Sequence, residues 1–357
     1  NVACYRGHSF KPAVVKVCGI LLELGGGMDI ADLLAFSVNH GASDLHLSAG
    51  VVPMLRIDGD MQRCDFPVLG ADQVRRLVHG IMSEAQRRGF EAHLEADFAY
   101  ALPELGRFRV NAFEQQRGPG AVFRRIGQVV PSLESLGLGD VFSQLCHAPH
   151  GLVLVTGATG SGKTTTLAAM IDHLNRTCQR HILTLEDPIE FIHEPRQSLI
   201  SQREVYRHTH SFAAALRSAM REDPDVIMLG EMRDLDTIRL ALTAAETGHL
   251  VLATLHTSSA AKTVDRMVDV FPGDEKAMVR AMLSESLQAV VSQTLVKKTG
   301  GGRVAAHEIM LATPAIRHLI RENKVAQMVS AIQTGAAVGM QTLEMGLNRL
   351  REQGLTH

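Results

Sequence analysis

The sequence predicts an α/β protein of two domains, a small α+β domain followed by a larger domain built around a parallel β-sheet. Three observations support this fold class. The chain has 357 residues, 45% of them hydrophobic, which is enough to bury two cores. Segments in which apolar and polar residues alternate follow residue 28. From Gly151 onward, short and almost continuously apolar segments alternate with helical ones, as strands buried on both faces of a parallel sheet do.

Residues 1–27 are expected to be an appendage, because a helical pattern starts only at Met28. The apolar stretch "VVKVCGILLEL" is shorter than the roughly 20 residues that span a bilayer. Lys16 and Glu23 interrupt it and no clear small-residue cleavage site follows, which argues against a signal peptide. We hypothesise that Met28 is the initiator methionine.

Residues 28–127 are predicted to form the α+β domain. Apolar residues from Ile30 to Val38 recur at helical spacing. Strands joined by a hairpin at Asp58-Gly59 follow, and then two helical stretches, "ADQVRRLVHGIM" and "SEAQRRGFEAHLE". The segments "ADFAYAL", "GRFRVNAFEQQ" and "GAVFRRI" predict a β-meander. Residues 128–145 are expected to link this domain to the next.

Residues 146–357 are predicted to form the second domain. Its parallel strands are expected at the apolar segments "GLVLVTG", "HILTLE", "DVIMLGE" and "HLVLATLH". Helices are expected at 163–175, 211–221, 235–246 and 260–270. After Gly273 the chain is predicted to be mostly helical, with one strand-like segment, "GRVAAHEIML".

The charge balance and the cysteines limit the classes of function. With 36 basic and 38 acidic residues, the chain does not have the charge of a nucleic-acid coat protein, although a local basic groove remains compatible with it. The five cysteines include no C-x-x-C pair, so neither a disulfide framework nor a zinc ribbon is indicated. This pattern fits a reducing, cytosolic compartment.

The stretch "GATGSGKTTT" matches the phosphate-binding pattern G-x-x-x-x-G-K-[ST] and lies between an apolar strand and the start of a helix. Its glycines let backbone N–H groups face the phosphates, and the helix N-terminus adds positive potential. Lys163 is expected to reach the β- and γ-phosphates, and the Thr164 hydroxyl to ligate Mg²⁺. The predicted nucleotide-binding residues are Gly157, Ala158, Thr159, Gly160, Ser161, Gly162, Lys163, Thr164 and Thr165.

Two acidic groups follow predicted strands of the second domain. Glu231 comes directly after the apolar run "VIML" and Gly230, where it would face the Mg²⁺ side of the nucleotide. Glu186, Asp187 and Glu190 cluster after the strand "HILTLE", and one of them is a natural general base for an attacking water. A buried strand with a solvated acid at its tip remains the alternative for Glu231, and a solvated turn remains the alternative for the acidic cluster.

The histidines of "GHLVLATLHT" lie at opposite ends of one predicted strand. Seven extended steps put His249 and His256 about 23 Å apart, too far for one shared metal ion. His256 should emerge at the sheet edge that carries the phosphate loop, where it can contact a phosphate or a carboxylate. His249 is expected to serve a domain or subunit interface. Polar ends on a buried strand remain the alternative for both residues.

The phosphate loop, "LEDPIEF", "LGEMRD" and "GHLVLATLHTSSAAKTVDR" occur in an order that resembles the secretion ATPases of type II secretion and type IV pili. The resemblance implies a catalytic acid at Glu190 in an acidic box that starts at Glu186. It further implies a Walker B acid at Glu231, and a histidine box with His249 and His256 followed by Arg266. Arginines of the first domain approach the ATP phosphates in this family, and Arg109 and Arg124 are the candidates here. Arg221, just upstream of the Walker B strand in the second domain, is another candidate. Structural salt bridges remain the alternative for these arginines.

The resemblance is greatest to the pilus-retraction branch, because "AIRHLIRE" resembles its C-terminal signature, although an ordinary packed helix also explains that stretch. It implies a PAS-like domain followed by a RecA-like ATPase domain with a helical C-terminal part. It also implies a homo-hexameric, cytoplasmic motor that uses ATP and Mg²⁺ for pilus retraction and twitching motility. The motor would dock on an inner-membrane platform protein at the pilus base. The resemblance implies that the chain has no transmembrane segment and binds no nucleic acid.

Three alternatives stay open. A companion retraction ATPase, which is also a candidate partner, is separated less cleanly by sequence than an assembly ATPase is. An assembly or secretion ATPase typically carries a larger N-terminal region and a four-cysteine zinc module, which this sequence lacks. A RecA-like nucleic-acid translocase should show a basic channel with aromatic residues, whereas aromatics make up 4% of this chain and tryptophan is absent.

Overall fold

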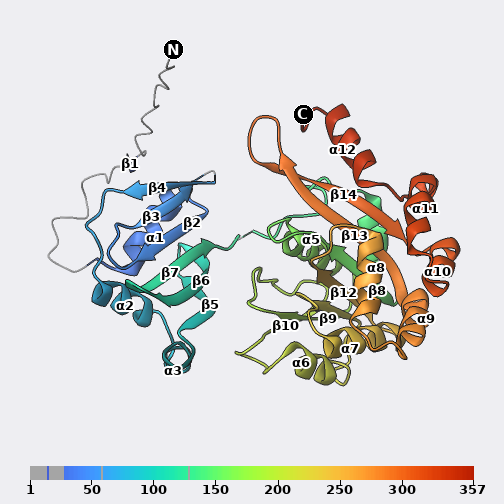
Figure 1. The fold of residues 1–357 in the computed structure, drawn as a ribbon, viewed down its shortest axis with the longest axis horizontal. Helices are drawn as coiled ribbons and strands as arrows, with labels where there is room; N and C mark the ends of the chain where they lie inside the picture. The colour runs from blue at the N-terminus through green and yellow to red at the C-terminus, as the bar shows by residue number, and fades with distance from the viewer. Residues whose placement is uncertain (1–13, 16–27, 58, 128) are drawn as a thin grey trace, which may run out of the picture. The chain divides into compact units, whose positions relative to one another are not determined.

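A computed structural model describes residues 14–15, 28–57, 59–127 and 129–357 (Figure 1). The chain divides into two compact units, the second of which is Val129–His357. The expected appendage, residues 1–27, lies outside the described residues apart from strand β1 (Val14–Val15). Among the described helices, none is long and apolar enough to cross a bilayer.

The first unit is one sheet covered by helices, as the alternating segments predict. Its strand order is β1-β4-β3-β2-β7-β6-β5, antiparallel except where β1 pairs with β4. Helices and strands share one core, which includes Leu34, Val74, Phe90, Phe108 and Phe123. The elements after β1 are α1 (Ile30–Asn39), β2 (Asp44–Ser48), β3 (Met54–Ile57), β4 (Asp60–Cys64), α2 (Ala71–Gly80), α3 (Glu84–His93), β5 (Glu95–Leu102), β6 (Gly106–Gln115) and β7 (Gly118–Arg125).

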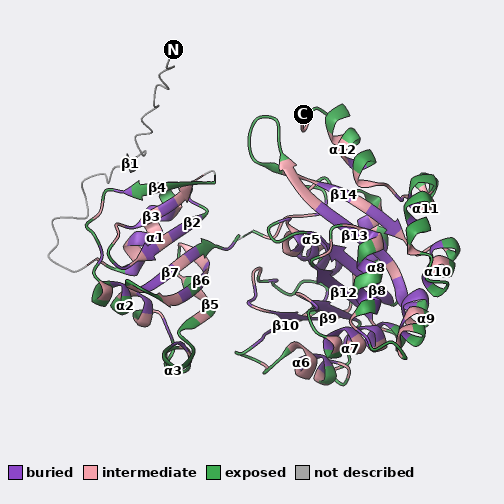
Figure 2. Cartoon of the chain, viewed as in Figure 1, coloured by how far each residue is buried: buried purple, intermediate pink, exposed green. Residues whose placement is uncertain are grey.

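The second unit is built on a seven-stranded sheet of order β10-β9-β11-β12-β8-β13-β14. Neighbouring strands run parallel up to β13, and β14 pairs antiparallel to β13. The four parallel strands expected from the sequence are all present and are buried throughout or nearly so (Figure 2). The strands are β8 (Gly151–Thr156), β9 (His181–Glu186), β10 (Leu199–Glu204), β11 (Val226–Leu229), β12 (Leu250–Leu255), β13 (Leu287–Lys297) and β14 (Arg303–Leu311).

Helices bury both faces of this sheet, because alternate strand residues point to opposite sides. Leu152 and Leu154 of β8 belong to a core with α6 to α11, whereas Val153 and Val155 belong to a core with α4 and α5. The helices are α4 (Asp140–Cys146), α5 (Lys163–Thr177), α6 (Phe212–Ala219), α7 (Leu235–Glu246), α8 (Ala260–Asp269), α9 (Lys276–Ser286), α10 (Pro314–Arg321), α11 (Met328–Thr334) and α12 (Leu343–Glu352), with short 3₁₀ turns at Val325–Gln327 and Ala336–Val338.

Two strands of the second sheet were not predicted. The expectation of a mostly helical chain after Gly273 missed one strand, because β13 follows α9 without an intervening turn and pairs with both β8 and β14. Its polar residues, including Gln288, Ser292 and Gln293, break the apolar run that marks the other central strands. Strand β10 lies at the sheet edge and is mostly polar, so it too lacks that pattern.

The segment expected to be a linker, residues 128–145, belongs to the second unit from Val129 onward. Leu133, Leu138 and Phe142 are buried in the core that covers one face of the second sheet. The Phe142 ring also meets the imidazole of His307 edge-on, with ring centroids 5.3 Å apart. These contacts make the segment part of the packed domain.

Replacing Phe142 with alanine should therefore destabilise the second unit by about 3–5 kcal/mol, the usual range for emptying an aromatic core position. Urea-induced unfolding of the full chain measures this change. Val129→Ala is the matched control in the same segment, because the Val129 side chain is 82% exposed. Equal stabilities for the two variants would contradict the assignment of this segment to the core.

Candidate nucleotide site at the carboxyl edge of the second sheet

The predicted site residues of the second unit converge on one edge of its sheet. Strands β8, β9, β11 and β12 are parallel neighbours, so the loops that follow them meet at their carboxyl ends. These loops carry the glycine-rich stretch, the acidic box, Glu231 and His256, respectively. Ligands of open parallel sheets bind at this edge.

The glycine-rich loop wraps tightly between β8 and α5. Gly157, Gly160 and Gly162 have φ of 142°, 77° and 89°, a region that favours glycine. A Cβ on Gly157 would lie 2.3 Å from the backbone oxygen of Gln293, so no other residue fits there without moving the backbone. The Ser161 hydroxyl is buried in this loop and has no hydrogen-bond partner among the described residues.

Lys163 starts helix α5 and is buried. Its Nζ donates to the backbone oxygens of Gly157, at 2.9 Å, and Ala158, at 3.0 Å, so the ammonium lies over the loop. Burial lowers the pKa of Lys163, while the carboxylates of Glu231 and Glu190 act in the opposite direction. The loop lysine is thus within the electrostatic reach of both predicted acids.

His256 connects the loop lysine to the acid after β11. Its Nδ1 lies 3.5 Å from Lys163 Nζ and its Nε2 lies 3.4 Å from Glu231 Oε2. An ammonium group has no acceptor, so Nδ1 accepts and Nε2 carries the proton that is donated to Glu231. Glu231 is 14% exposed and also pairs with Arg233, whose Nε lies 2.7 Å from the same oxygen.

The acids of the acidic box have different environments. Glu186 is buried at the end of β9, and burial raises the pKa of its carboxyl group to about 7. Thr184 and Gln202 side chains donate to Glu186 Oε1, and the Glu190 backbone N–H donates to Oε2. Glu190 is half-buried and faces the loop lysine closely enough to affect its pKa. Asp187 is also half-buried.

Three predicted residues of the second unit lie outside this cluster. His249 is at the other end of β12, where its Nδ1 lies 3.0 Å from the Ala244 oxygen at the end of α7. Arg221 is exposed and precedes β11 by several residues, which places it toward the opposite sheet edge. Arg266 is exposed on α8, and its side chain makes no hydrogen bond or ion pair with the residues that the structure describes.

The predicted arginines of the first unit both form ion pairs within that unit. Arg109 on β6 pairs with Asp97 on β5, with 2.6 Å between the nearest nitrogen and oxygen. Arg124 on β7 pairs with Asp44 on β2 at 2.8 Å and is 64% exposed. Each of these two arginines therefore has a salt-bridge partner, as the structural alternative predicts. Their contact with a phosphate stays a prediction.

Two glutamines on the unpredicted strands hold the site loops. Gln293 on β13 donates from Nε2 to the Ser161 oxygen at 2.6 Å and accepts from the Thr166 hydroxyl at 2.8 Å. Gln202 on β10 contacts the acidic-box loop. Neither residue belongs to the phosphate loop, the acidic box, the Walker B segment or the histidine box. The β-branched character of "AVVSQTLV" is the sequence signal that could have revealed β13.

The residues present fit a magnesium ion held jointly with phosphates. The Thr164 side chain is half-exposed and makes no hydrogen bond to the described residues, so its oxygen is available as a ligand. No group of three or more histidine, cysteine, aspartate or glutamate side chains within the described chain could hold a metal ion by itself. Mg²⁺ is usually bound in this way, by one or two protein oxygens with phosphates and water.

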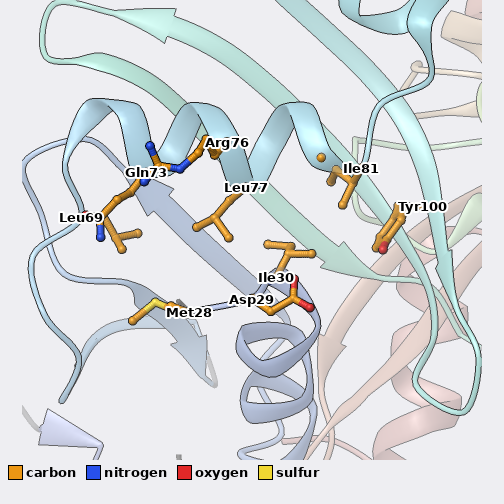
Figure 3. Close-up of a pocket in the computed structure, with 10 residues that line it drawn as sticks. Met28, Asp29, Ile30, Leu69, Gln73, Arg76, Leu77, Ile81 and Tyr100 are labelled. Atoms are coloured by element: carbon orange, nitrogen blue, oxygen red, sulfur yellow. Dashed lines mark hydrogen bonds between the residues drawn. The ribbon is translucent and has the colours of Figure 1, made fainter. Parts of the chain in front are cut away.

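A separate hollow lies in the first unit and contains none of the predicted site residues. Its volume is about 310 Å³, and it opens between α1, α2 and β5 (Figure 3). The lining residues are Met28, Asp29, Ile30, Leu69, Gln73, Arg76, Leu77, Gly80, Ile81 and Tyr100.

Comparisons with known proteins agree with the fold and the motifs. The family model described as "Type II/IV secretion system protein" matches residues 29–301. The type IV pilus retraction ATPase PilT of Pseudomonas aeruginosa is 66% identical over 92% of this chain and 95% of its own length. The type IV pilus ATPase PilU of the same organism is 42% identical over 92% of this chain and 86% of its length.

A solved structure confirms the predicted fold class. The crystal structure of the pilus retraction motor PilT with bound ADP superposes with a TM-score of 0.84 at 46% identity, covering 92% of this chain and 95% of that one.

The buried Glu186 predicts a pH-dependent stability. Between about pH 4.5 and 7 the unfolded chain releases the Glu186 proton while the folded chain retains it, so stability falls as the pH rises through this window. The loss is complete above the folded pKa and amounts to about 3 kcal/mol. Glu186→Gln should remove this dependence, as measured by urea unfolding between pH 5 and 8. Glu194→Gln is the control, because Glu194 is exposed. An unchanged slope in Glu186→Gln would refute this attribution.

Proposed function

Because the chain belongs to the type II/IV secretion system protein family, we propose that it hydrolyses ATP to power type IV pilus retraction and twitching motility. The observation that carries the proposal is the convergence of Lys163, His256 and Glu231 on an intact phosphate loop. The 66% identity to a retraction ATPase over nearly the whole chain supports the same activity.

The phosphate loop binds the nucleotide. Backbone N–H groups from Gly157 to Thr164 and the N-terminus of α5 attract the phosphate oxygens. Phosphate oxygens are stronger acceptors for the Lys163 ammonium than the two backbone oxygens that it contacts. Lys163 therefore stabilises the negative charge on the β- and γ-phosphates during transfer.

Glu190 is the residue that orients or deprotonates the attacking water. A general base must be accessible to water and within hydrogen-bond reach of the proton that it takes. Glu186 is less suited, because its carboxyl group is buried and its oxygens already accept hydrogen bonds from Thr184, Gln202 and the Glu190 backbone. Glu186 instead accepts the backbone N–H of Glu190 and so supports the base.

Thr164 and Glu231 would hold a magnesium ion that binds together with the nucleotide. When bound, Mg²⁺ neutralises charge on the phosphate oxygens and helps to align them. His256 contacts both Lys163 and Glu231, so a change at the phosphates alters both of its hydrogen bonds. We infer that His256 reports the nucleotide state, and that Arg266, exposed on α8, carries the signal to the next subunit.

The working assembly is a cytoplasmic homo-hexamer that docks on a PilC-like platform protein at the inner membrane. Arg109 and Arg124 would contact ATP phosphates by exchanging carboxylate partners for phosphate oxygens, which guanidinium groups bind in a similar geometry. Arg221 remains a weaker candidate for such a contact. Hydrolysis is proposed to change the relation between the two units and so to move the platform.

An accessory retraction ATPase is the second candidate function. PilU matches the same share of this chain, but at 42% identity against 66% for PilT, which favours the principal motor. An assembly or secretion ATPase is disfavoured for the same reason. A nucleic-acid translocase is disfavoured by the low aromatic content and the absence of tryptophan.

Lys163→Ala should reduce ATP turnover by a factor on the order of 100 or more, because it removes the cation that faces the transferring phosphate. Phosphate release by the purified full-length chain measures the loss. Lys276→Ala is the control, because the Lys276 ammonium pairs with Asp269 on helices away from the loop. Wild-type turnover in Lys163→Ala would overturn the site assignment.

In the host, replacing the gene with the Lys163→Ala form should abolish twitching and leave excess surface pili, because assembly continues without retraction. Microscopy of pili and a plate assay of twitching provide the two measurements. Loss of the pili themselves would show that the protein drives assembly instead. Normal twitching beside normal pili would refute the retraction role.

A further inference from the structure

The loop that carries Glu190 has no helix or strand of its own. Residues 187–193 lie between the end of β9 and the segment that leads to β10, and they contain neither regular element. The position of such a loop depends on side chains that bind its backbone, since its own polar groups need partners. The structure shows which side chains do so.

Gln202 on β10 makes three hydrogen bonds with its single amide group. Its Oε1 accepts the His193 backbone N–H at 2.8 Å, and its Nε2 donates to the Phe191 oxygen at 2.9 Å. The same Nε2 lies 3.2 Å from Oε1 of Glu186. One side chain therefore contacts the acid that starts the loop and two backbone groups on the far side of Glu190.

Two acids complete this support. Glu204 Oε2 accepts the Ile189 backbone N–H at 3.1 Å, and Glu186 Oε2 accepts the Glu190 N–H at 3.4 Å. Strand register explains why these groups cooperate: Gln202 pairs with Thr184, and Glu204 pairs with Glu186. Alternate residues of a strand share a face, so the side chains that bind the loop lie on one side of β9 and β10.

We propose that Gln202 is a positioning residue, which acts through the loop backbone to hold Glu190 at the attacking water. This inference rests on the proposed function of Glu190. A glutamine is needed because a carboxylate cannot donate to Phe191 and an aliphatic side chain can do neither task. The phosphate loop has a different support, Gln293 on β13, so losing Gln202 leaves nucleotide binding intact.

Loss of Gln202 should slow the chemical step of ATP hydrolysis without weakening nucleotide binding. Displacement of a catalytic group by about 1 Å can reduce the rate on the order of 100-fold. Gln202→Met, which keeps the length of the side chain, should therefore lower kcat by about tenfold to 100-fold. Its affinity for ADP should stay within about twofold of the wild-type value, because Lys163 and the phosphate loop are untouched.

The experiment measures kcat, KM and ADP affinity for the full-length wild type and four variants: Gln202→Met, Gln202→Glu, Glu190→Gln and the double variant Glu190→Gln with Gln202→Met. Gln202→Glu keeps the acceptor for His193 but loses both donations, so it should also lower kcat. If Gln202 acts through Glu190, the double variant should be no slower than Glu190→Gln alone. Gln197→Met is the matched control, because Gln197 is exposed and its side chain makes no hydrogen bond to described residues.

Each unfavourable result has a distinct meaning. A normal kcat in Gln202→Met, beside an inactive Glu190→Gln, would overturn the positioning role alone. A parallel loss of kcat and ADP affinity, or a further loss in the double variant, would show that Gln202 supports the fold in general and would overturn it as well. Wild-type turnover in Glu190→Gln would overturn the proposed base, on which the inference depends.

Discussion

The close approach of the phosphate loop to strand β13 is the constraint on which the rest of the site depends. Gly157 can lie against the Gln293 backbone only because it has no Cβ, and the Gln293 amide then binds Ser161 and Thr166 on either side of Lys163. Three independent contacts thus fix both ends of the loop to one strand. The direction in which α5 and its lysine emerge follows from this attachment, and Lys163 then contacts the loop oxygens and His256.

From Lys163 the site continues through three further side chains that contact one another in sequence. The ammonium, the imidazole of His256, the carboxylate of Glu231 and the guanidinium of Arg233 follow one another at hydrogen-bonding or ion-pairing distances. Because each group bonds to the next, a change in the partner of one group alters the hydrogen bonds of its neighbour. A phosphate that competes for the Lys163 ammonium therefore affects His256, which also has a hydrogen bond to Glu231.

The sequence predicted those parts of the site that lie after strongly apolar strands. The continuous apolar runs ending near Thr156, Leu229 and Leu255 were sufficient to place the phosphate loop, Glu231 and His256 at one edge. The spacing within β12 also separated His249 from that edge correctly. The supporting strands were missed, because β10 is polar at the sheet edge and β13 carries glutamines where an apolar run was expected. Gln202 and Gln293 could not be found without the pairing partners that only the fold brings beside them.

Substitution of Gln202 or Gln293 is one way in which a related sequence would lose activity while its motifs stay unchanged. Each amide uses both its donor and its acceptor on backbone or side-chain groups of a site loop, so few other residues could replace it. A gene copy released from selection could change either position and still retain every glycine, acid and histidine by which such proteins are recognised. Loss of Gln202 is then expected to leave a chain that binds nucleotide and turns it over slowly, whereas loss of Gln293 removes a support of the phosphate loop itself. The residues at these two strand positions therefore carry information about activity that the motifs do not contain, if the two glutamines have the supporting roles described above.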